Sequence, residues 1–277
     1  MRKTILTIYG VLAVAAVSAQ KIITAGSAIT ETVCALGHCH NIIASDRTSL
    51  YPPHIQKLPS IGYRTSISAE GVIALQPSLF IAEKEYVDAT VLTQLRNAGV
   101  NILELKRVYT YEGTADMIRQ IATALGKTRE GEVLIQKIKG ELEEAAMLIK
   151  KGNKSPRVLC VFNRDKSSLN MGGTNTFSAI LPYVGAESAI QGVEGYKPLN
   201  TEALMAANPD YLLMFESGVQ SLGGVEGVLR IPGVMQTTAG LKKQIIVVEG
   251  IKLSNFGPRL GEAVKEVATQ LYAQPKP

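Results

Sequence analysis

The sequence predicts an α/β protein with two similar lobes, each built around a central parallel sheet, and a ligand cleft between them. Three observations support this prediction. Short apolar strands alternate with helices along both halves of the chain. One long helix is expected at 127–152, between the halves. The second half also repeats a pattern of the first. Strands that alternate with helices form parallel sheets covered by helices, which sets the fold class.

In the first half, short apolar runs predict strands, and apolar residues at helical spacing predict helices. The expected strands are 21–26, 41–46, 78–83 and 100–105, and the expected helices are 27–37, 68–77, 88–99 and 113–126. Between them, 47–66 is rich in Pro, Ser and Tyr and has no periodicity. We therefore expect a long loop there, and long ordered loops on an α/β scaffold commonly carry function.

The middle of the chain predicts a helical strut. The stretch 127–152 keeps helical periodicity, and about 24 helical residues span roughly 36 Å. Beyond it the alternation resumes. The expected strands are 157–162, 210–215 and 244–249, and the expected helices are 175–185, 201–209, 224–234 and 257–273. This divides the chain into an N-terminal lobe at 20–126, a connecting helix at 127–152 and a C-terminal lobe at 153–277.

An internal repeat relates the two halves. Residues 66–83 align with 198–215, because both contain a polar cap, a glutamate, a short helix, a proline and an apolar strand. The residues in register are Glu70 with Glu202 and Pro77 with Pro209, each 132 residues apart, and Tyr63 with Tyr196 at nearly the same offset. Such self-similarity predicts two Rossmann-like lobes of one design.

The first nineteen residues resemble a cleavable secretory signal peptide. A basic start is followed by an apolar run at 5–17 and by small residues up to Ala19. The run is shorter than the about 20 residues of a membrane span, so we expect export to the periplasm. Without Arg2 and Lys3 the chain has 27 basic against 24 acidic residues. This weak charge, with no dense basic run, argues against nucleic acid as a partner.

Two cysteines, Cys34 and Cys39, lie close together where the first helix should end. In an oxidising compartment they could close a small disulfide loop. Together with His38 and His40 they also resemble a metal cluster. A tight group of this kind at a helix end is more often a local staple or an exposed loop. The haem-attachment pattern Cys-x-x-Cys-His is absent.

Two lobes, one connecting helix, an export signal and no catalytic signature predict a binding protein with a cleft. Over nearly the whole mature chain, the sequence resembles the class III periplasmic substrate-binding proteins of ABC importers, which serve cobalamin, ferric siderophores and haem. The segments at 46–52, 61–77 and 195–204 most resemble the haem-transport members. The resemblance implies a monomeric carrier, not an enzyme, that captures b-type haem and delivers it to an inner-membrane permease.

The resemblance also implies an iron ligand. In the haem-transport members a tyrosine that follows glycine in this loop binds the iron, and the matching residue is Tyr63. Ferric iron and a nearby cation favour the phenolate form of tyrosine, and tyrosine is an established axial haem ligand. Arg64 could hydrogen-bond the phenolate or pair with a haem propionate. Relatives often carry this arginine one residue later, where this chain has Thr65.

Further haem-pocket residues are expected just beyond strand ends, where open α/β sheets bind ligands. They are Arg47 and Tyr51 in the first half, and Asn163, Arg164, Met171 and Tyr196 in the second. Each of these residue types is individually more common as a surface or packing residue. His54, in the same loop as Tyr63, would be a solvated side chain or a second axial ligand.

Two glutamates have a different implied role. In the class III fold, a glutamate on each lobe meets arginines of the permease, and the matching residues are Glu70 and Glu202. Two separated carboxylates would set the orientation of docking and speed encounter. Each could also interact with the dipole of its own helix, because it lies near a helix N-terminus.

Three alternatives remain open. The same fold could carry cobalamin or a ferric siderophore, although a siderophore site needs converging basic residues and the loops offer few. An exported metal-dependent enzyme would use His38, His40 and His54, but the sequence contains no HExxH or Gly-x-Ser-x-Gly motif. A zinc- or manganese-binding protein of related architecture would have only the cluster at 34–40 as its anchor.

Overall fold

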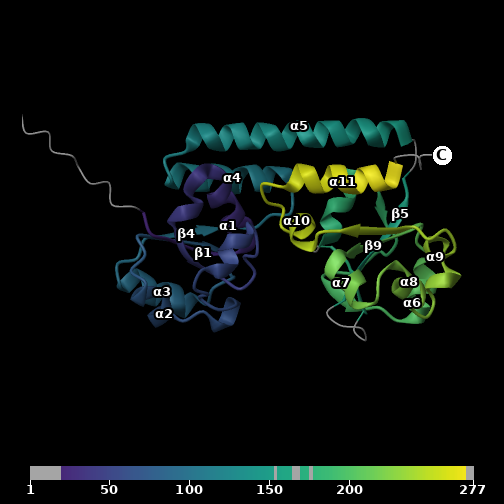
Figure 1. The fold of residues 1–277 in the computed structure, drawn as a ribbon, viewed down its shortest axis with the longest axis horizontal. Coiled ribbons are helices and arrows are strands. Elements are labelled where there is room, and N and C mark those ends of the chain that lie inside the picture. Colours follow the sequence, from purple (N-terminus) through teal and green to yellow (C-terminus); the bar gives the residue numbers. More distant parts are fainter. Residues whose placement is uncertain (1–19, 153–154, 164–168, 175–176, 273–277) are drawn as a thin grey trace, which may run out of the picture.

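The computed structural model describes residues 20–152, 155–163, 169–174 and 177–272. The predicted signal peptide at 1–19 and Arg164 lie outside these residues. Two lobes stand side by side, and one long helix, α5 (Thr128–Gly152), runs along the same side of both (Figure 1). The predicted two-lobe α/β architecture with a helical connection is confirmed.

The first lobe contains a fully parallel sheet of order β2-β1-β3-β4. Its strands are β1 (Ile22–Ala25), β2 (Ile42–Ser45), β3 (Leu79–Glu83) and β4 (Ile102–Leu105). Its α-helices are α1 (Ser27–Val33), α2 (Ala69–Ala74), α3 (Ala89–Asn97) and α4 (Tyr111–Ala124). Successive strand residues point to opposite faces. Ile22 therefore packs with α1 and α4, and Ile23 packs with α2 and α3.

Short helical turns complete the first lobe. The predicted helix at 27–37 is α-helical up to Val33 and continues as a π-helical turn from Cys34. Helical geometry is lost at Gly37, which adopts a left-handed φ of 84°. The turns are η1 (Cys34–His38), η2 (Cys39–Asn41), η3 (Pro53–Lys57) and η4 (Arg64–Ser66). The last two interrupt the predicted long loop at 47–66, which otherwise contains no strand or α-helix.

The second lobe has a mixed sheet of order β10-β9-β5-β6-β8, with β7 beside β5. Three of its strands form the predicted parallel core: β5 (Arg157–Asn163), β9 (Tyr211–Phe215) and β10 (Ile245–Val248). Three more were not predicted: β6 (Leu169–Gly172), β7 (Glu187–Ser188) and β8 (Tyr196–Pro198). β6 and β8 pair antiparallel. They are too short and too polar to show a period of two residues, so their pairing depends on the neighbouring strand.

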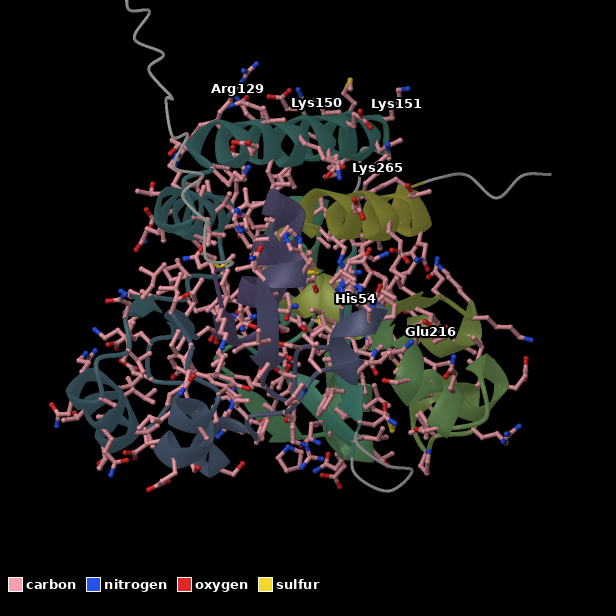
Figure 2. All side chains as sticks on the ribbon, turned by 60° about the vertical axis from the view of Figure 1, so that its left-hand side comes forward. His54, Arg129, Lys150, Lys151, Glu216 and Lys265 are labelled. Carbon is pink, nitrogen blue, oxygen red and sulfur yellow. A yellow bond between two sulfur atoms is a disulfide. The ribbon has the colours of Figure 1, made fainter. Side chains whose placement is uncertain are left out.

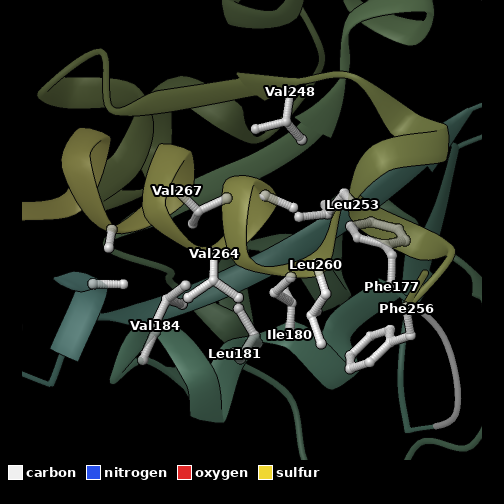
Figure 3. Close-up of a cluster of buried hydrophobic side chains, with 14 of the residues drawn as sticks. Phe177, Ile180, Leu181, Val184, Val248, Leu253, Phe256, Leu260, Val264 and Val267 are labelled. Atoms are coloured by element: carbon white, nitrogen blue, oxygen red, sulfur yellow. The ribbon is translucent and has the colours of Figure 1, made fainter. Parts of the chain in front are cut away.

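The helices of the second lobe are short. They are η5 (Phe177–Val184), α6 (Thr201–Ala207), α7 (Glu216–Ser221), α8 (Val225–Leu229), η6 (Val234–Gln236), α9 (Thr238–Leu241), α10 (Gly250–Ser254) and α11 (Leu260–Tyr272). The helix predicted at 175–185 is the 3₁₀-helix η5, which contains Pro182. Proline removes a backbone donor and disfavours continuous α-helix. Figure 3 shows the core in which η5, β10, α10 and α11 meet.

Helix α5 packs on helices of both lobes. Gly131 lies against α4, where an added Cβ would come within 2.6 Å of the Ala122 Cβ. Gly261 of α11 lies equally close to α5, so small residues allow both helices to approach. On its outer side α5 carries basic residues, including Arg129, Lys150 and Lys151, which point away from the lobes (Figure 2). None of the described helices is long and apolar enough to span a membrane.

A second connection joins the lobes beneath α5. Two nitrogens of Arg259, which precedes α11, donate to the two carboxylate oxygens of Glu31 on α1, at 2.7 and 2.8 Å. Asn255 accepts a hydrogen bond from Ser27 at 2.7 Å. Burial raises the pKa of Glu31, and its hydrogen bonds from Arg259 oppose that rise. The lobes are therefore held together by buried polar contacts as well as by α5.

Candidate ligand cleft

The carboxyl ends of the parallel strands of the two sheets meet between the lobes. Arg107, just beyond β4, donates to the backbone carbonyls of Ser254 and Asn255 at 3.0 and 3.1 Å. These two residues end α10, which follows β10. Open α/β sheets bind ligands beyond the carboxyl ends of their strands, so this junction marks the cleft.

A polar cavity of ≈ 450 Å³ lies on the first-lobe side of this cleft. Its wall comes from the loops after β2, β3 and β4. The lining residues are Arg64, Glu83, Lys84, Glu85, Tyr86, Lys106, Arg107 and Tyr109. Sequence reasoning found only Arg64 among them. The others lie at or just beyond the ends of β3 and β4, so the expectation of ligand contacts at strand ends, applied to these two strands, would have found them.

Arg64 lines this cavity, and Tyr63 lies beside it, in contact with Tyr86. The Tyr63 side chain is 44% exposed, and its ring meets the Tyr86 ring edge-on, with centroids 6.5 Å apart. The guanidinium carbon of Arg64 lies 4.9 Å from the centroid of Tyr86 and 5.8 Å from that of Tyr63. Arg64 therefore reaches both rings as a cation–π partner, although it stands one residue earlier than the arginine that the family resemblance implies.

The backbone around Tyr63 explains the glycine before it. Gly62 has a φ of 105°, and an added Cβ would lie 2.7 Å from the Ser66 carbonyl oxygen. The Ser66 hydroxyl accepts from the Tyr63 backbone N–H at 2.8 Å, and the Ser66 N–H donates to the Tyr63 carbonyl at 2.8 Å. This tight turn requires glycine at 62 and presents the Tyr63 side chain outward.

Tyr86 is held differently from Tyr63. Its hydroxyl donates to Asp46 at 2.5 Å, and Asp46 is only 2% exposed. Asp46 also accepts from the Gly26 N–H at 3.0 Å and from the Ser49 hydroxyl at 2.6 Å. Burial and the hydrogen bond to Asp46 both raise the pKa of Tyr86. Tyr86 is therefore a neutral positioning phenol, and Tyr63 is the exposed phenol of the pair.

Arg107 forms the charged floor of the cavity. It donates to Glu83 at 2.7 Å, and its guanidinium carbon lies 4.8 Å from the centroid of Tyr109. Burial raises the pKa of Glu83, and the charge of Arg107 opposes that rise. The buried Nε of Arg107 has no hydrogen-bond partner among the described residues. A buried donor of this kind suits an anionic group of a ligand.

The second lobe presents an aromatic wall. It consists of Tyr196, Phe162 and Phe215, which pack with Phe177 of the core; Phe177 is only 1% exposed, and the neighbouring ring centroids are 4.5–6.2 Å apart. Tyr196 is 45% exposed. Its pKa is raised first by burial, and Tyr109 and Arg107 of the first lobe are near enough to affect it as well. Tyr196, the predicted partner of Tyr63, is thus the most exposed ring of this wall.

The structure places the other predicted pocket residues elsewhere. Asn163 is buried and donates to the Gly218 carbonyl at 3.2 Å and to the Ser221 hydroxyl at 2.9 Å, contacts that position α7. Met171 packs against the second-lobe core. Arg47 lines a separate cavity of ≈ 220 Å³ beneath its loop. Tyr51 lines a third, near Arg259.

Glu70 and Glu202 occupy equivalent positions on the two lobes. Each is exposed in the first turn of a short helix, two residues after a capping side chain. The Ser68 hydroxyl accepts from the Gly71 N–H at 3.0 Å, and the Asn200 side chain accepts from the Ala203 N–H at 2.8 Å. Within the described chain neither glutamate forms an ion pair. Their helices are therefore capped without them.

Comparisons with known proteins agree with this architecture. Residues 22–250 match the family model of periplasmic binding proteins. The chain therefore belongs to the periplasmic binding protein family, whose members bind substrates for ABC transporters and are not enzymes. Its two-lobe form is that of a class III substrate-binding protein.

Solved structures of haem-binding proteins are close in fold. The periplasmic haem-binding protein RhuT from Roseiflexus sp. RS-1 is 32% identical, with a TM-score of 0.85, over 92% of this chain and 98% of that one. The periplasmic haem-binding protein BhuT, in complex with two haems, is 33% identical, with a TM-score of 0.84, over 91% and 97%.

Curated relatives are more distant and more varied. The ABC transporter substrate-binding lipoprotein YvrC of Bacillus subtilis is 24% identical over 91% of this chain and 80% of its own length. The vitamin B12-binding protein of Vibrio campbellii is 27% identical over 70% of each chain. The names of the curated relatives indicate more than one ligand, including vitamin B12 and ferric citrate.

Proposed function

We propose that this protein binds b-type haem in the cleft and delivers it to an ABC importer. The observation that carries the proposal is the pairing of two unlike walls around an exposed tyrosine. Haem has a flat apolar macrocycle, a ferric iron and two carboxylates. The second-lobe aromatic wall suits the macrocycle, Tyr63 suits the ferric iron, and the first-lobe cations suit the carboxylates.

The Arg64 side chain could contribute to haem binding in either of two orientations. Beside Tyr63, its charge would favour the phenolate form that binds ferric iron. Turned into the cavity, it would pair with a propionate together with Lys84, Lys106 or Arg107. Solved structures with high similarity to this chain include haem-binding proteins by name, which favours haem over the other ligands of the family.

The remaining parts of the proposal concern delivery. Export by the predicted signal peptide at 1–19 would bring the protein to the periplasm. Glu70 and Glu202, exposed at equivalent points of the two lobes, would meet arginines of an inner-membrane permease. The membership of the chain in a family of ABC transporter substrate-binding proteins supports such a partner.

Cobalamin is the second candidate, because curated relatives include vitamin B12-binding proteins. Cobalamin carries mainly neutral amides and a single phosphate where haem carries two carboxylates, so it would offer fewer anionic partners to the cations of the first-lobe cavity. The cavity residues therefore favour haem.

The test is a titration of the haem-free protein with ferric haem and, separately, with cyanocobalamin. We expect a high-spin ferric spectrum with a tyrosinate-to-iron charge-transfer band. Tyr63→Phe should remove that band, and Tyr51→Phe, a tyrosine of the same loop at another cavity, should keep it. An unchanged spectrum in Tyr63→Phe would overturn the ligation. Binding of cyanocobalamin without binding of haem would overturn the choice of ligand.

A further inference from the structure

Two cysteines and a histidine converge away from the ligand cleft. The ligand atoms of Cys34, Cys39 and His54 all lie within 4.8 Å of one another. The His54 Nε2 is 3.1 Å from the Cys39 sulfur. The cysteines follow α1, and His54 belongs to η3 in the next loop. Tertiary folding therefore brings His54 into a group for which the sequence suggested His38 and His40.

The group opens into a cavity of ≈ 420 Å³ at the junction of the lobes and α5. Its lining includes both cysteines, His54, Leu134 of α5 and Glu262 of α11. His54 is exposed and lies beneath α11 near this junction (Figure 2). Both sulfurs belong to half-buried residues. A small reductant and a metal ion can therefore reach the group from solvent.

In the structure Cys34 and Cys39 form a disulfide. A disulfide sulfur carries no thiolate charge, and the thiolate is the form of cysteine that binds metals. The nearby carboxylates have other partners, because Glu31 is bonded to Arg259 and Glu262 to Lys137. In the oxidised protein the group thus offers one imidazole and no anionic ligand.

We propose that Cys34, Cys39 and His54 form a Zn²⁺ site that becomes available when a dithiol reduces the disulfide. Two electrons and two protons pass from the dithiol to the cystine. The Cys34–Cys39 S–S bond breaks, two thiols form, and the dithiol becomes a disulfide. Zn²⁺ then binds both sulfurs and the imidazole, and the two thiol protons are released to solvent.

The ligand set fits the chemistry of zinc. Two thiolates, one imidazole and one water make a recognised tetrahedral zinc set with an open position. With Zn–S bonds of about 2.3 Å, the two sulfurs must separate to about 3.8 Å. Rotation about the Cα–Cβ bonds of two half-buried cysteines supplies this movement. Soft thiolates also select zinc over magnesium or calcium.

The test uses the full haem-free chain in two redox states. One sample is treated with dithiothreitol without denaturant and desalted without oxygen, and the other is left oxidised. Alkylation and mass spectrometry count the free thiols at Cys34 and Cys39. Both samples are then titrated with Co²⁺, whose tetrahedral thiolate complexes absorb strongly, and with Zn²⁺ against a chromogenic chelator.

We expect one equivalent of metal in the reduced protein and none in the oxidised protein. His54→Ala should weaken binding at least about 100-fold, more than the loss of an outer partner costs. His40→Ala, an exposed histidine of the same region, should leave it unchanged. The proposal is overturned if dithiothreitol exposes no thiols at 34 and 39, if both redox states bind equally, or if His54→Ala binds as the parent does.

Discussion

The two lobes repeat one design at a distance from the ligand and differ where they face it. Glu70 and Glu202, their capping residues and the following strands β3 and β9 all keep an offset of 132 residues. Even the left-handed residues that end the two helices, Gln76 at φ 49° and Asn208 at φ 36°, keep it. The cleft walls do not, because one is charged and the other is aromatic.

This difference separates two requirements on one fold. A docking surface whose partner contacts both lobes in the same way can keep the same residue on each lobe. A cleft that holds an amphiphilic molecule needs unlike walls, one for its charges and one for its apolar face. The repeated glutamates and the unlike walls can be tested separately.

The largest expected effect is on transport. Glu70→Lys with Glu202→Lys should abolish haem uptake, since two reversed charges would oppose arginines of the permease. Each single variant should reduce it partly if the lobes contribute alike. Haem binding should be unchanged, because both residues lie outside the cleft.

The measurement is ATP-driven haem uptake into proteoliposomes that contain the permease, together with a haem titration. Glu143→Lys, an exposed glutamate on α5, is the matched control and should transport normally. Full transport by the double variant would contradict the docking role. Loss of haem binding in the double variant would show that the docking surface and the ligand cleft are not separate.

The next effect concerns the junction that holds the unlike lobes together. Arg259→Met should cost about 3–5 kcal/mol of unfolding free energy at neutral pH, because it leaves the buried Glu31 without its cation. Burial already raises the pKa of Glu31, and losing Arg259 raises it further. A folded-state pKa above the unfolded one favours folding at low pH and loses that contribution as pH rises. The loss of unfolding free energy in Arg259→Met, relative to the parent protein, should therefore become smaller as the pH falls.

Urea denaturation at pH 7 and pH 5 measures this deficit. Arg119→Met is the matched control, because Arg119 pairs with Glu132 on the surface, with both side chains about half exposed. It should cost less than about 1 kcal/mol. Equal costs for the two variants, or a deficit for Arg259→Met that does not depend on pH, would show that the buried bridge contributes nothing special.

The smallest effects compare the two walls directly. Arg64→Met should weaken haem binding by about 1.5–3 kcal/mol through loss of a charged hydrogen bond. Tyr196→Leu should weaken it by about 0.5–1.5 kcal/mol through loss of an aromatic contact. Haem dimethyl ester, whose propionates carry no charge, separates the two roles of Arg64. If Arg64 pairs with a propionate, Arg64→Met should not weaken binding of the ester.

The readout is the dissociation constant of each variant for haem and for its dimethyl ester. An Arg64→Met effect that persists with the ester would assign Arg64 to the phenolate of Tyr63. A Tyr196→Leu effect that appears only with the free acid would show that the second-lobe wall is not simply apolar. Equal losses for the two variants with both ligands would remove the contrast between the walls.

Local patterns were sufficient for the parts of the fold that local physics controls. Helical periodicity located α5 within two residues, because a long amphipathic helix repeats its signal many times. The common spacing of Glu70 with Glu202 and of Pro77 with Pro209 located the internal repeat. Of the second-lobe cleft wall the sequence indicated Tyr196 but not Phe162, Phe177 and Phe215. These three belong to the apolar runs of β5, η5 and β9, which predict burial but not which rings group together beside the cleft.

The sequence by itself determined the α/β class, the two lobes, the connecting helix and the position of Tyr63 after a glycine in a long loop. Each of these depends on residues close together in the chain. Tertiary structure alone decided that Tyr86 is bound to Asp46, that Arg107 reaches the second lobe, and that His54 joins Cys34 and Cys39. Such contacts join residues far apart in sequence, and their distances depend on how whole elements pack, which no local pattern encodes.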